Sequence, residues 1–271
     1  MGGVCACASL AAGRGALGQD DVVDVPVGPL PLATQPGAKP VDFDKTWLEP
    51  YFTKGPAKDG LDRFREEDWA GADAGFGKAV RALKKGSDEL LAARYMLALS
   101  RENASKWKEA GDAFEALYDA APKLATYHAY HAARCRLRGG DAAGALAWAD
   151  KVTAGTVPEA ETTLIRIDAF RALARWDEAK AAIEAFLARF PNGPRRAEAL
   201  FKRGEAMEKL AAGKPSDANA ALLDVTAVYR RVWSEAPLEP WADRAAERLE
   251  ALATTRPKDE ARLVRTHGAG E

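Results

Sequence analysis

The sequence predicts an all-α solenoid, a linear stack of antiparallel helix pairs. Its composition is rich in alanine and sparse in β-branched residues, and its glycines and prolines lie between segments with helical periodicity. An anchor residue, usually alanine, recurs five times, each time followed by apolar residues on the same helix face. The anchors are residues 72, 110, 145, 179 and 225, so the steps between them are 38, 35, 34 and 46 residues. Periods in this range are typical of stacked helix pairs.

Each anchor predicts the second helix of a pair. Offsets of three and four residues place side chains on one helix face, and a small anchor lets a neighbouring helix approach closely. We expect the tryptophan three residues before an anchor to fill the contact between successive pairs, with a ligand-facing role as the alternative. The residues assigned to the repeat pattern are Trp69, Ala72, Phe76, Trp107, Ala110, Phe114, Ala145, Trp176, Ala179 and Tyr229.

Prolines are expected to mark helix ends. Pro122, Pro191 and Pro237 stand twelve residues after their anchors, where a residue without a backbone N–H ends a helix or opens a turn. In the fifth pair, the first helix is expected near residues 199–210 and contains Gly204. Glycine costs about 1 kcal/mol of helix propensity relative to alanine, so we expect a tight helix crossing there. A loop follows, and the next helix is expected to be longer than its counterparts.

The chain is expected to divide into four segments. Residues 1–18 are small and apolar and predict an export signal, with Cys7 as a lipoprotein-type acylation site. Residues 19–43 hold five prolines and predict a disordered tether. Helical repeats are expected over residues 44–253 and a polar tail over 254–271, and no later segment is apolar for long enough to span a bilayer. A cytoplasmic protein with a disordered start is the alternative to export.

The charge balance argues against nucleic acid and anionic membranes as partners. The chain carries 39 basic and 40 acidic residues, with a formal net charge of −1 and no long basic run. Short basic clusters are interpreted as solvated helix faces, with a groove for an acidic ligand as the alternative. Of the three cysteines only Cys135 lies in the repeat region, which excludes a disulfide framework.

One helix of the third pair raises the question of a metal site. His128, His131 and Cys135 are spaced three and four residues apart, so they share one helix face. Zinc ligands lie about 2.0–2.3 Å from the metal and normally come from more than one element, so we favour packing of this face over metal binding. No metal and no cofactor are expected. The chain also lacks a Gly-rich phosphate loop, a Gly-x-Ser-x-Gly elbow and a His-Glu-x-x-His pair, so we assign no catalytic residue.

The adjoining face of the same helix is the candidate binding surface. Tyr127, Tyr130 and Arg134 lie there at helical spacing. If the third pair follows the usual register, this face lines the concave groove of the stack. We therefore predict that these three side chains contact the ligand.

Residues 176–252 contain helix segments that mix aromatic and basic residues. The segments are Ala185–Pro191, Ala199–Ala206, Tyr229–Trp233 with Pro237, Trp241-Ala242 and Ala246–Leu249. This stretch resembles the helical superhelix that precedes the catalytic domain of soluble lytic murein transglycosylases. The 34-residue step is also that of tetratricopeptide repeats, and the repeats are similar to those of tetratricopeptide proteins in envelope assembly.

The transglycosylase resemblance implies a periplasmic protein associated with peptidoglycan. Those enzymes cleave the glycan strands of peptidoglycan without water, using one glutamate as acid and base. Their catalytic glutamate stands in a Glu-Ser pair and is followed by a Gly-Leu-Met-Gln signature, and this sequence contains neither. No catalytic residue can be carried over, and activity would require this chain to be part of a longer enzyme.

Three functional hypotheses follow from the sequence. The first is a non-catalytic, tetratricopeptide-like scaffold of the bacterial cell envelope that binds a glycan strand or a partner protein. The second is a free-standing tetratricopeptide adaptor for protein–protein interaction in envelope assembly. The third is a cytoplasmic scaffold. All three expect a binding protein, and none predicts a nucleic-acid partner.

Overall fold

The computed structural model describes residues 43–156, 158–212 and 218–254, together with 258, 261, 262 and 264. All of them belong to one contact unit of the chain. Regular structure within these ranges is entirely helical, which confirms the predicted all-α class. None of the described helices combines the length and the apolar character that crossing a bilayer requires. The expected export signal, Cys7 and all but the last residue of the tether lie outside the described residues.

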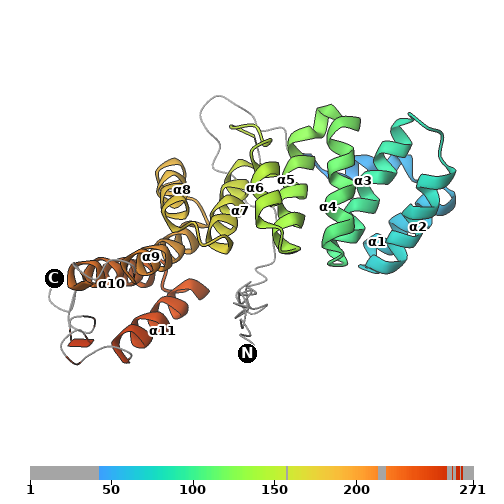
Figure 1. The fold of residues 1–271 in the computed structure, drawn as a ribbon. Coiled ribbons are helices and arrows are strands. Elements are labelled where there is room, and N and C mark those ends of the chain that lie inside the picture. Colours follow the sequence, from blue (N-terminus) through green and yellow to red (C-terminus); the bar gives the residue numbers. More distant parts are fainter. Residues whose placement is uncertain are drawn as a thin grey trace, which may run out of the picture. The chain divides into compact units, whose positions relative to one another are not determined.

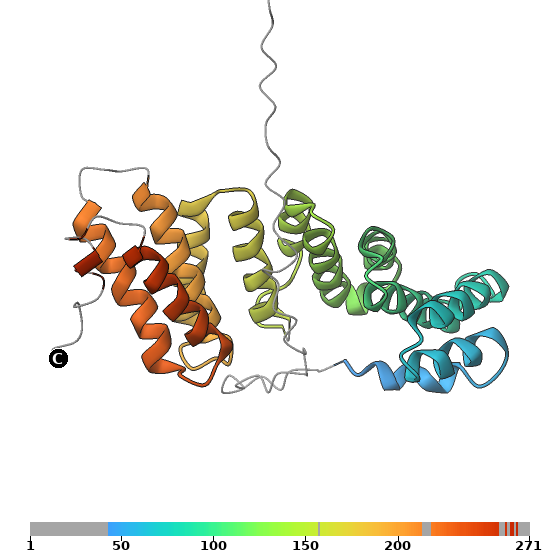
Figure 2. The ribbon, with the colours of Figure 1, turned by 90° about the horizontal axis from the view of Figure 1, so that it is seen from below.

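The helices pack as consecutive pairs (Figures 1 and 2), and each helix contacts the next one in the chain. The pairs are α1 (Gly55–Arg65) with α2 (Trp69–Ala82), α3 (Asp88–Asn103) with α4 (Trp107–Ala120), α5 (Ala125–Arg138) with α6 (Ala142–Ala149), α7 (Glu159–Ala172) with α8 (Trp176–Arg189), and α9 (Arg196–Ala212) with α10 (Ala218–Glu235). Helix α11 (Pro240–Thr254) follows, and the 3₁₀ helices η2 (Lys45–Tyr51) and η3 (Pro122–Leu124) precede α1 and α5. We call α1, α3, α5, α7, α9 and α11 the first helices. Some of them also contact each other, as α5 does with α7 and α9 with α11.

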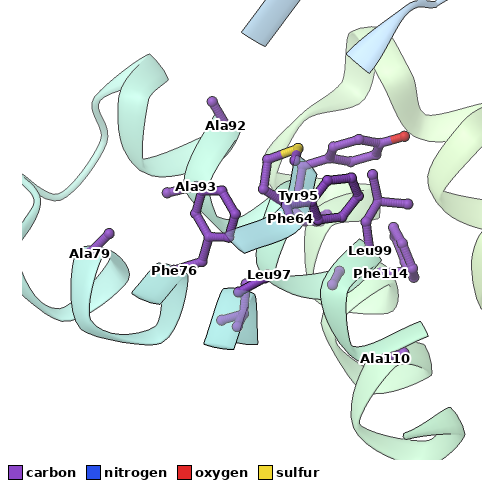
Figure 3. Packing of buried hydrophobic residues seen from close by; sticks show 14 of the residues in the cluster. Phe64, Phe76, Ala79, Ala92, Ala93, Tyr95, Leu97, Leu99, Ala110 and Phe114 are labelled. Carbon is purple, nitrogen blue, oxygen red and sulfur yellow. The ribbon is translucent and has the colours of Figure 1, made fainter. Parts of the chain in front are cut away.

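The anchor residues lie at the buried contacts between helices. Ala72, Ala110, Ala145 and Ala179 are fully buried, and Val225 is almost so. The phenylalanines four residues after the first two anchors belong to one apolar cluster shared by α1 to α5, part of which is drawn in Figure 3. The repeat in the sequence therefore corresponds to a repeated contact in the fold.

The turns inside the first four pairs share one backbone conformation. The residue five positions before each anchor has a positive φ, namely 59° at Glu67, 56° at Ser105, 83° at Gly140 and 54° at Ala174. In each turn the backbone N–H of the following residue donates to the carbonyl five residues earlier. This hydrogen bond pairs a carbonyl that the end of the first helix would otherwise leave unpaired, as in a Schellman motif. Only one of the four residues is glycine, and the left-handed region costs other residues about 1–2 kcal/mol.

The expected proline stops coincide with helix ends. Helices α4, α8 and α10 each end two residues before Pro122, Pro191 or Pro237. The third pair departs from the pattern, because α6 has 8 residues where α2, α4 and α8 have 14. Helix α10 has 18 residues and is longer than the other second helices, as expected. Part of the predicted loop before it lies outside the described residues.

Gly204 lies where α9 crosses α10. A Cβ added to Gly204 would come within 2.6 Å of the Tyr229 ring, which is fully buried. The close approach explains why a residue of poor helix propensity stands in the middle of α9. At the end of the chain, Ala261 and Val264 are buried, and Val264 packs in the cluster of α9 to α11. The boundary of the expected polar tail stays a prediction.

Candidate functional site

Charged residues form rows across neighbouring first helices. Three ion pairs between α7 and the α9 segment each join residues 34 positions apart, with N–O distances of 3.4 Å for Arg195–Glu161, 2.7 Å for Lys202–Asp168 and 2.5 Å for Arg171–Glu205. Equivalent residues of successive repeats therefore face one another. We call the resulting surface the polar band. It comprises Glu102, Tyr130, His131, Arg134, Glu161, Asp168, Arg171, Arg195, Glu198, Lys202 and Glu205.

Glu102 organises the α3–α5 part of the polar band. Its side chain is 3% exposed, lies 2.8 Å from His131 Nδ1 and accepts a 2.7 Å hydrogen bond from Arg134 Nε. Burial by itself raises the pKa of the carboxyl group, but His131 and Arg134 hold that pKa well below its usual range. Glu102 is therefore ionised and fixes the positions of both partners.

Arg134 links Glu102 to Tyr130. Its Nη1 donates a 3.2 Å hydrogen bond to the Tyr130 hydroxyl, and its guanidinium lies 5.3 Å from the centre of the Tyr130 ring. This arrangement leaves the Arg134 side chain 28% exposed. The hydrogen bonds hold the guanidinium in one orientation, so a ligand would meet a preorganised cation at this point.

The residues considered for metal binding are engaged in packing. His128 is 1% exposed, its ring nitrogens have no hydrogen-bond partner among the described residues, and it lies 5.7 Å from the Tyr95 ring. Burial lowers the pKa of His128 to about 4, so the ring is neutral near pH 7. Cys135 is fully buried, and burial raises the pKa of its thiol. No set of three His, Cys, Asp or Glu side chains within the described ranges is arranged to hold a metal ion.

Lys202 and Glu198 form the most buried ion pair of the α7–α9 part. Their side chains are each 5% exposed, and Lys202 Nζ also lies 2.7 Å from Asp168. Burial raises the pKa of Glu198 and Asp168, but Lys202 outweighs burial and lowers both, with help from Arg195 at Glu198 and Arg171 at Asp168. These charges are matched within the protein and therefore hold α7 and α9 in register.

One carboxylate oxygen of Glu161 lacks a hydrogen-bond donor among the described residues. Its Oε1 is buried and accepts no hydrogen bond from any residue that the structure describes, while its Oε2 lies 3.4 Å from Arg195. Burial raises the pKa of this carboxyl group. Buried acceptors are almost always paired, so Glu161 marks a point where a ligand group would be stabilised.

The three predicted ligand residues lie along one face of α5, but they do not act alike. Tyr127 accepts a 3.3 Å hydrogen bond from the backbone N–H of Phe43, whereas Tyr130 and Arg134 belong to the polar band. Their contact with a ligand stays a prediction. The sequence analysis missed the acidic members of the band, which are Glu102, Glu161, Asp168, Glu198 and Glu205. The 34-residue spacing of opposite charges points to Glu161, Asp168 and Glu205. Glu102 does not follow that spacing, because its partners Arg134 and His131 lie 32 and 29 residues away.

The repeat tryptophans lie at helix contacts. The Trp69 ring lies 5.1 Å from Phe64 of its own pair, and Trp176 packs on the cluster shared by α7, α8 and α9. Trp107 is partly buried, and its Cβ lies beside Gly139 at the end of α5 in the next pair. The tryptophans therefore stabilise contacts both within and between pairs.

Comparison with known proteins identifies one repeat directly. A family model described as a tetratricopeptide repeat matches residues 164–193, which cover most of α7 and all of α8. No curated protein matches the chain. The family match and the helix pairs together make the chain a tetratricopeptide-like helical repeat protein.

Solved structures of other repeat proteins are similar at low identity. A putative kinesin light chain with nearly identical TPR-like repeats from Podosopora anserina is 14% identical over 70% of this chain and 98% of its own, with a TM-score of 0.49. A point variant of the same protein gives 14% identity, 71% and 100% coverage and the same TM-score of 0.49. A tetratricopeptide repeat protein from Parabacteroides merdae is 11% identical over 82% of this chain and all of its own, with a TM-score of 0.31. None of these three is a lytic transglycosylase.

Proposed function

We propose that the chain is a non-catalytic scaffold that binds an extended segment of a protein partner along the polar band. The observation that carries this proposal is the register of the first helices, which places charged side chains in rows on one face. Arg134, Glu161 and Asp168 are held by ion pairs yet remain 28%, 21% and 31% exposed. Tetratricopeptide-like repeats, which the family match supports, are a protein-binding architecture.

An extended peptide suits this surface better than a compact ligand. Such a peptide exposes backbone N–H and C=O groups about every 3.3 Å, and the polar band offers both donors and acceptors along its length. Because the side chains of the band already hold one another in place, binding requires little further ordering of the protein.

The resemblance of residues 176–252 suggests a peptidoglycan strand as a second ligand and the cell envelope as the location. Both rest on that resemblance alone, and the tetratricopeptide match favours a protein partner. Cosedimentation of the chain with purified peptidoglycan tests the glycan ligand, and cell fractionation tests the location. We expect a protein partner to be found and the peptidoglycan pellet to contain no more of this chain than a control pellet.

Affinity capture from the cells that make the protein tests the proposal. The bait is wild type, Tyr130→Ala, Glu161→Gln, or the control Glu109→Gln on the exposed face of α4. We expect a partner protein that wild type and Glu109→Gln retain equally and that Tyr130→Ala retains about tenfold less, a difference of about 1.4 kcal/mol. Equal recovery on all four baits would place binding elsewhere and refute the role of the polar band.

A further inference from the structure

Phe43 lies against two tyrosines of neighbouring first helices. Its ring meets the Tyr95 ring of α3 edge to face at 5.4 Å and lies 5.9 Å from the Tyr127 ring of α5. Its backbone N–H also donates a 3.3 Å hydrogen bond to the Tyr127 hydroxyl. Tyr95 itself is buried in the apolar cluster of Figure 3. We call the two tyrosine rings and the Tyr127 hydroxyl the Phe43 site.

The Phe43 site adjoins the polar band. The Tyr95 ring lies 6.2 Å from the ring of His131, which is a member of the band. Tyr127 precedes Tyr130 by three residues on α5, a spacing that places both side chains on one helix face. A segment bound at the Phe43 site is therefore next to the surface that the proposed function assigns to a partner.

The segment that carries Phe43 is fixed in the core at its other end. Phe52 is 2% exposed, and its ring lies 5.3 Å from that of Phe76. Between Phe43 and Phe52, η2 has no buried residue, and Trp47 and Tyr51 are 60% and 42% exposed. Segments with few buried apolar contacts open at a small cost in free energy. Phe43 can therefore leave its site while Phe52 keeps the segment attached.

The remaining contacts of η2 are weak. Arg65 and Glu49 form an ion pair of 2.5 Å whose side chains are both largely accessible to solvent, and such pairs add little stability. Lys45 Nζ lies 5.2 Å from the centre of the Phe64 ring, and Leu48 is only partly buried against the core. None of these contacts involves the Phe43 site, so they do not prevent its opening.

We propose that the Phe43 site anchors an aromatic side chain of the partner segment, and that Phe43 occupies the site in the free chain. This inference deepens the proposed function and rests on it for the existence of a partner. The partner residue supplies the same two groups as Phe43, a ring for Tyr95 and a backbone N–H for the Tyr127 hydroxyl. Because both residues compete for one site, Phe43 lowers the apparent affinity of the partner.

Competition within one chain sets the affinities that we expect. A short tether gives Phe43 an effective concentration of about 1 mM at its own site. With the site occupied about 90% of the time, a separate copy of the segment binds the empty site with a dissociation constant of about 0.1 mM. Occupation by Phe43 then weakens the binding of that copy to wild type about tenfold.

A peptide added to the full chain tests this inference. The probe is the acetylated peptide of residues 43–51, which ends before the buried Phe52 and carries fluorescein at its C-terminus. Fluorescence anisotropy measures its binding to wild type and to Phe43→Ala, whose helix content circular dichroism must show to be unchanged. We expect a dissociation constant of about 0.1 mM for Phe43→Ala and a tenfold higher value for wild type.

Two controls isolate the ring and the hydrogen bond. A peptide that itself carries Phe43→Ala lacks the ring and should bind neither protein measurably. Adding Tyr127→Phe to the Phe43→Ala chain removes the acceptor hydroxyl but keeps the ring, and should weaken binding of the original peptide severalfold. Equal binding of the two peptides, or equal binding of the original peptide to wild type and Phe43→Ala, overturns the inference. The absence of any binding to Phe43→Ala does the same.

Affinity capture separates this inference from the proposed function. A partner that depends on Tyr130 should be retained about tenfold more by Phe43→Ala than by wild type, while the exposed control Tyr51→Ala should behave as wild type. Equal or lower retention by Phe43→Ala overturns the inference and leaves the proposed function intact. Selective peptide binding with no captured partner supports the Phe43 site and contradicts the proposed function.

Discussion

Replacing Gly204 with alanine tests the close crossing of α9 and α10. The added Cβ would lie 2.6, 2.8 and 2.9 Å from three atoms of the Tyr229 ring. Tyr229 is fully buried and packs against Phe201 at a ring distance of 5.5 Å, so its ring has little room to move. Overpacking of this kind costs about 1–3 kcal/mol or more, and the gain in helix propensity returns only about 1 kcal/mol. We expect the free energy of unfolding to fall by up to about 2 kcal/mol relative to wild type.

Gly77→Ala is the matched control for Gly204→Ala. Gly77 lies inside α2, and its added Cβ would meet only the end of Arg81 at 3.8 Å. The free energy of unfolding of Gly77→Ala should rise by about 1 kcal/mol, from helix propensity alone. Urea denaturation followed by circular dichroism measures both variants against wild type. If Gly204→Ala were as stable as Gly77→Ala, the crossing would not be tight and the packing argument would be wrong.

Three further predictions concern charge and backbone. The pKa of His128 falls from 6.5 to about 4 on folding, so the neutral ring's contribution to the free energy of unfolding is complete above pH 6.5 and is lost as the pH falls through 4. This loss amounts to about 3 kcal/mol between pH 7 and 4. Urea denaturation across that range should show it in wild type, and His128→Leu should remove it. Glu102→Gln leaves Arg134 without its charge partner and should lower the free energy of unfolding by about 3–5 kcal/mol in the same assay at pH 7. Ala174→Gly removes the steric cost of a positive φ of 54° and should raise the melting temperature. The control Ala185→Gly, inside α8, should lower it. A decrease for both variants would show that the backbone at residue 174 is not strained.

The fold could be predicted because its signal is local. A small residue with an aromatic residue four positions later places both on one helix face, and the buried Ala72 and Phe76 show that this face is the packed one. The proline positions also predict helix ends, because proline has no backbone N–H for the hydrogen bond to the preceding turn of a helix. Such features depend on neighbours in the chain and can be read without knowing the rest of the structure.

The turns inside the pairs could not be predicted from residue type. Glycine is the usual marker of a positive φ, but Glu67, Ser105 and Ala174 occupy the position that Gly140 occupies in the third pair. The two helices that each turn joins impose this conformation through their packing. Local preference is overridden there by contacts that form only in the folded chain.

The sequence by itself determined the helical repeat, its period, and the buried face of the second helix in each pair. Only the tertiary structure decided which charges meet, because Glu102 reaches Arg134, and Glu161 reaches Arg195, across helices that are separate in the chain. Helix periodicity is set by bonds within a few residues, whereas an ion pair between first helices depends on the offset at which one pair packs on the next. That offset is fixed by the shapes of many buried side chains together, which is why the polar band emerges only in three dimensions.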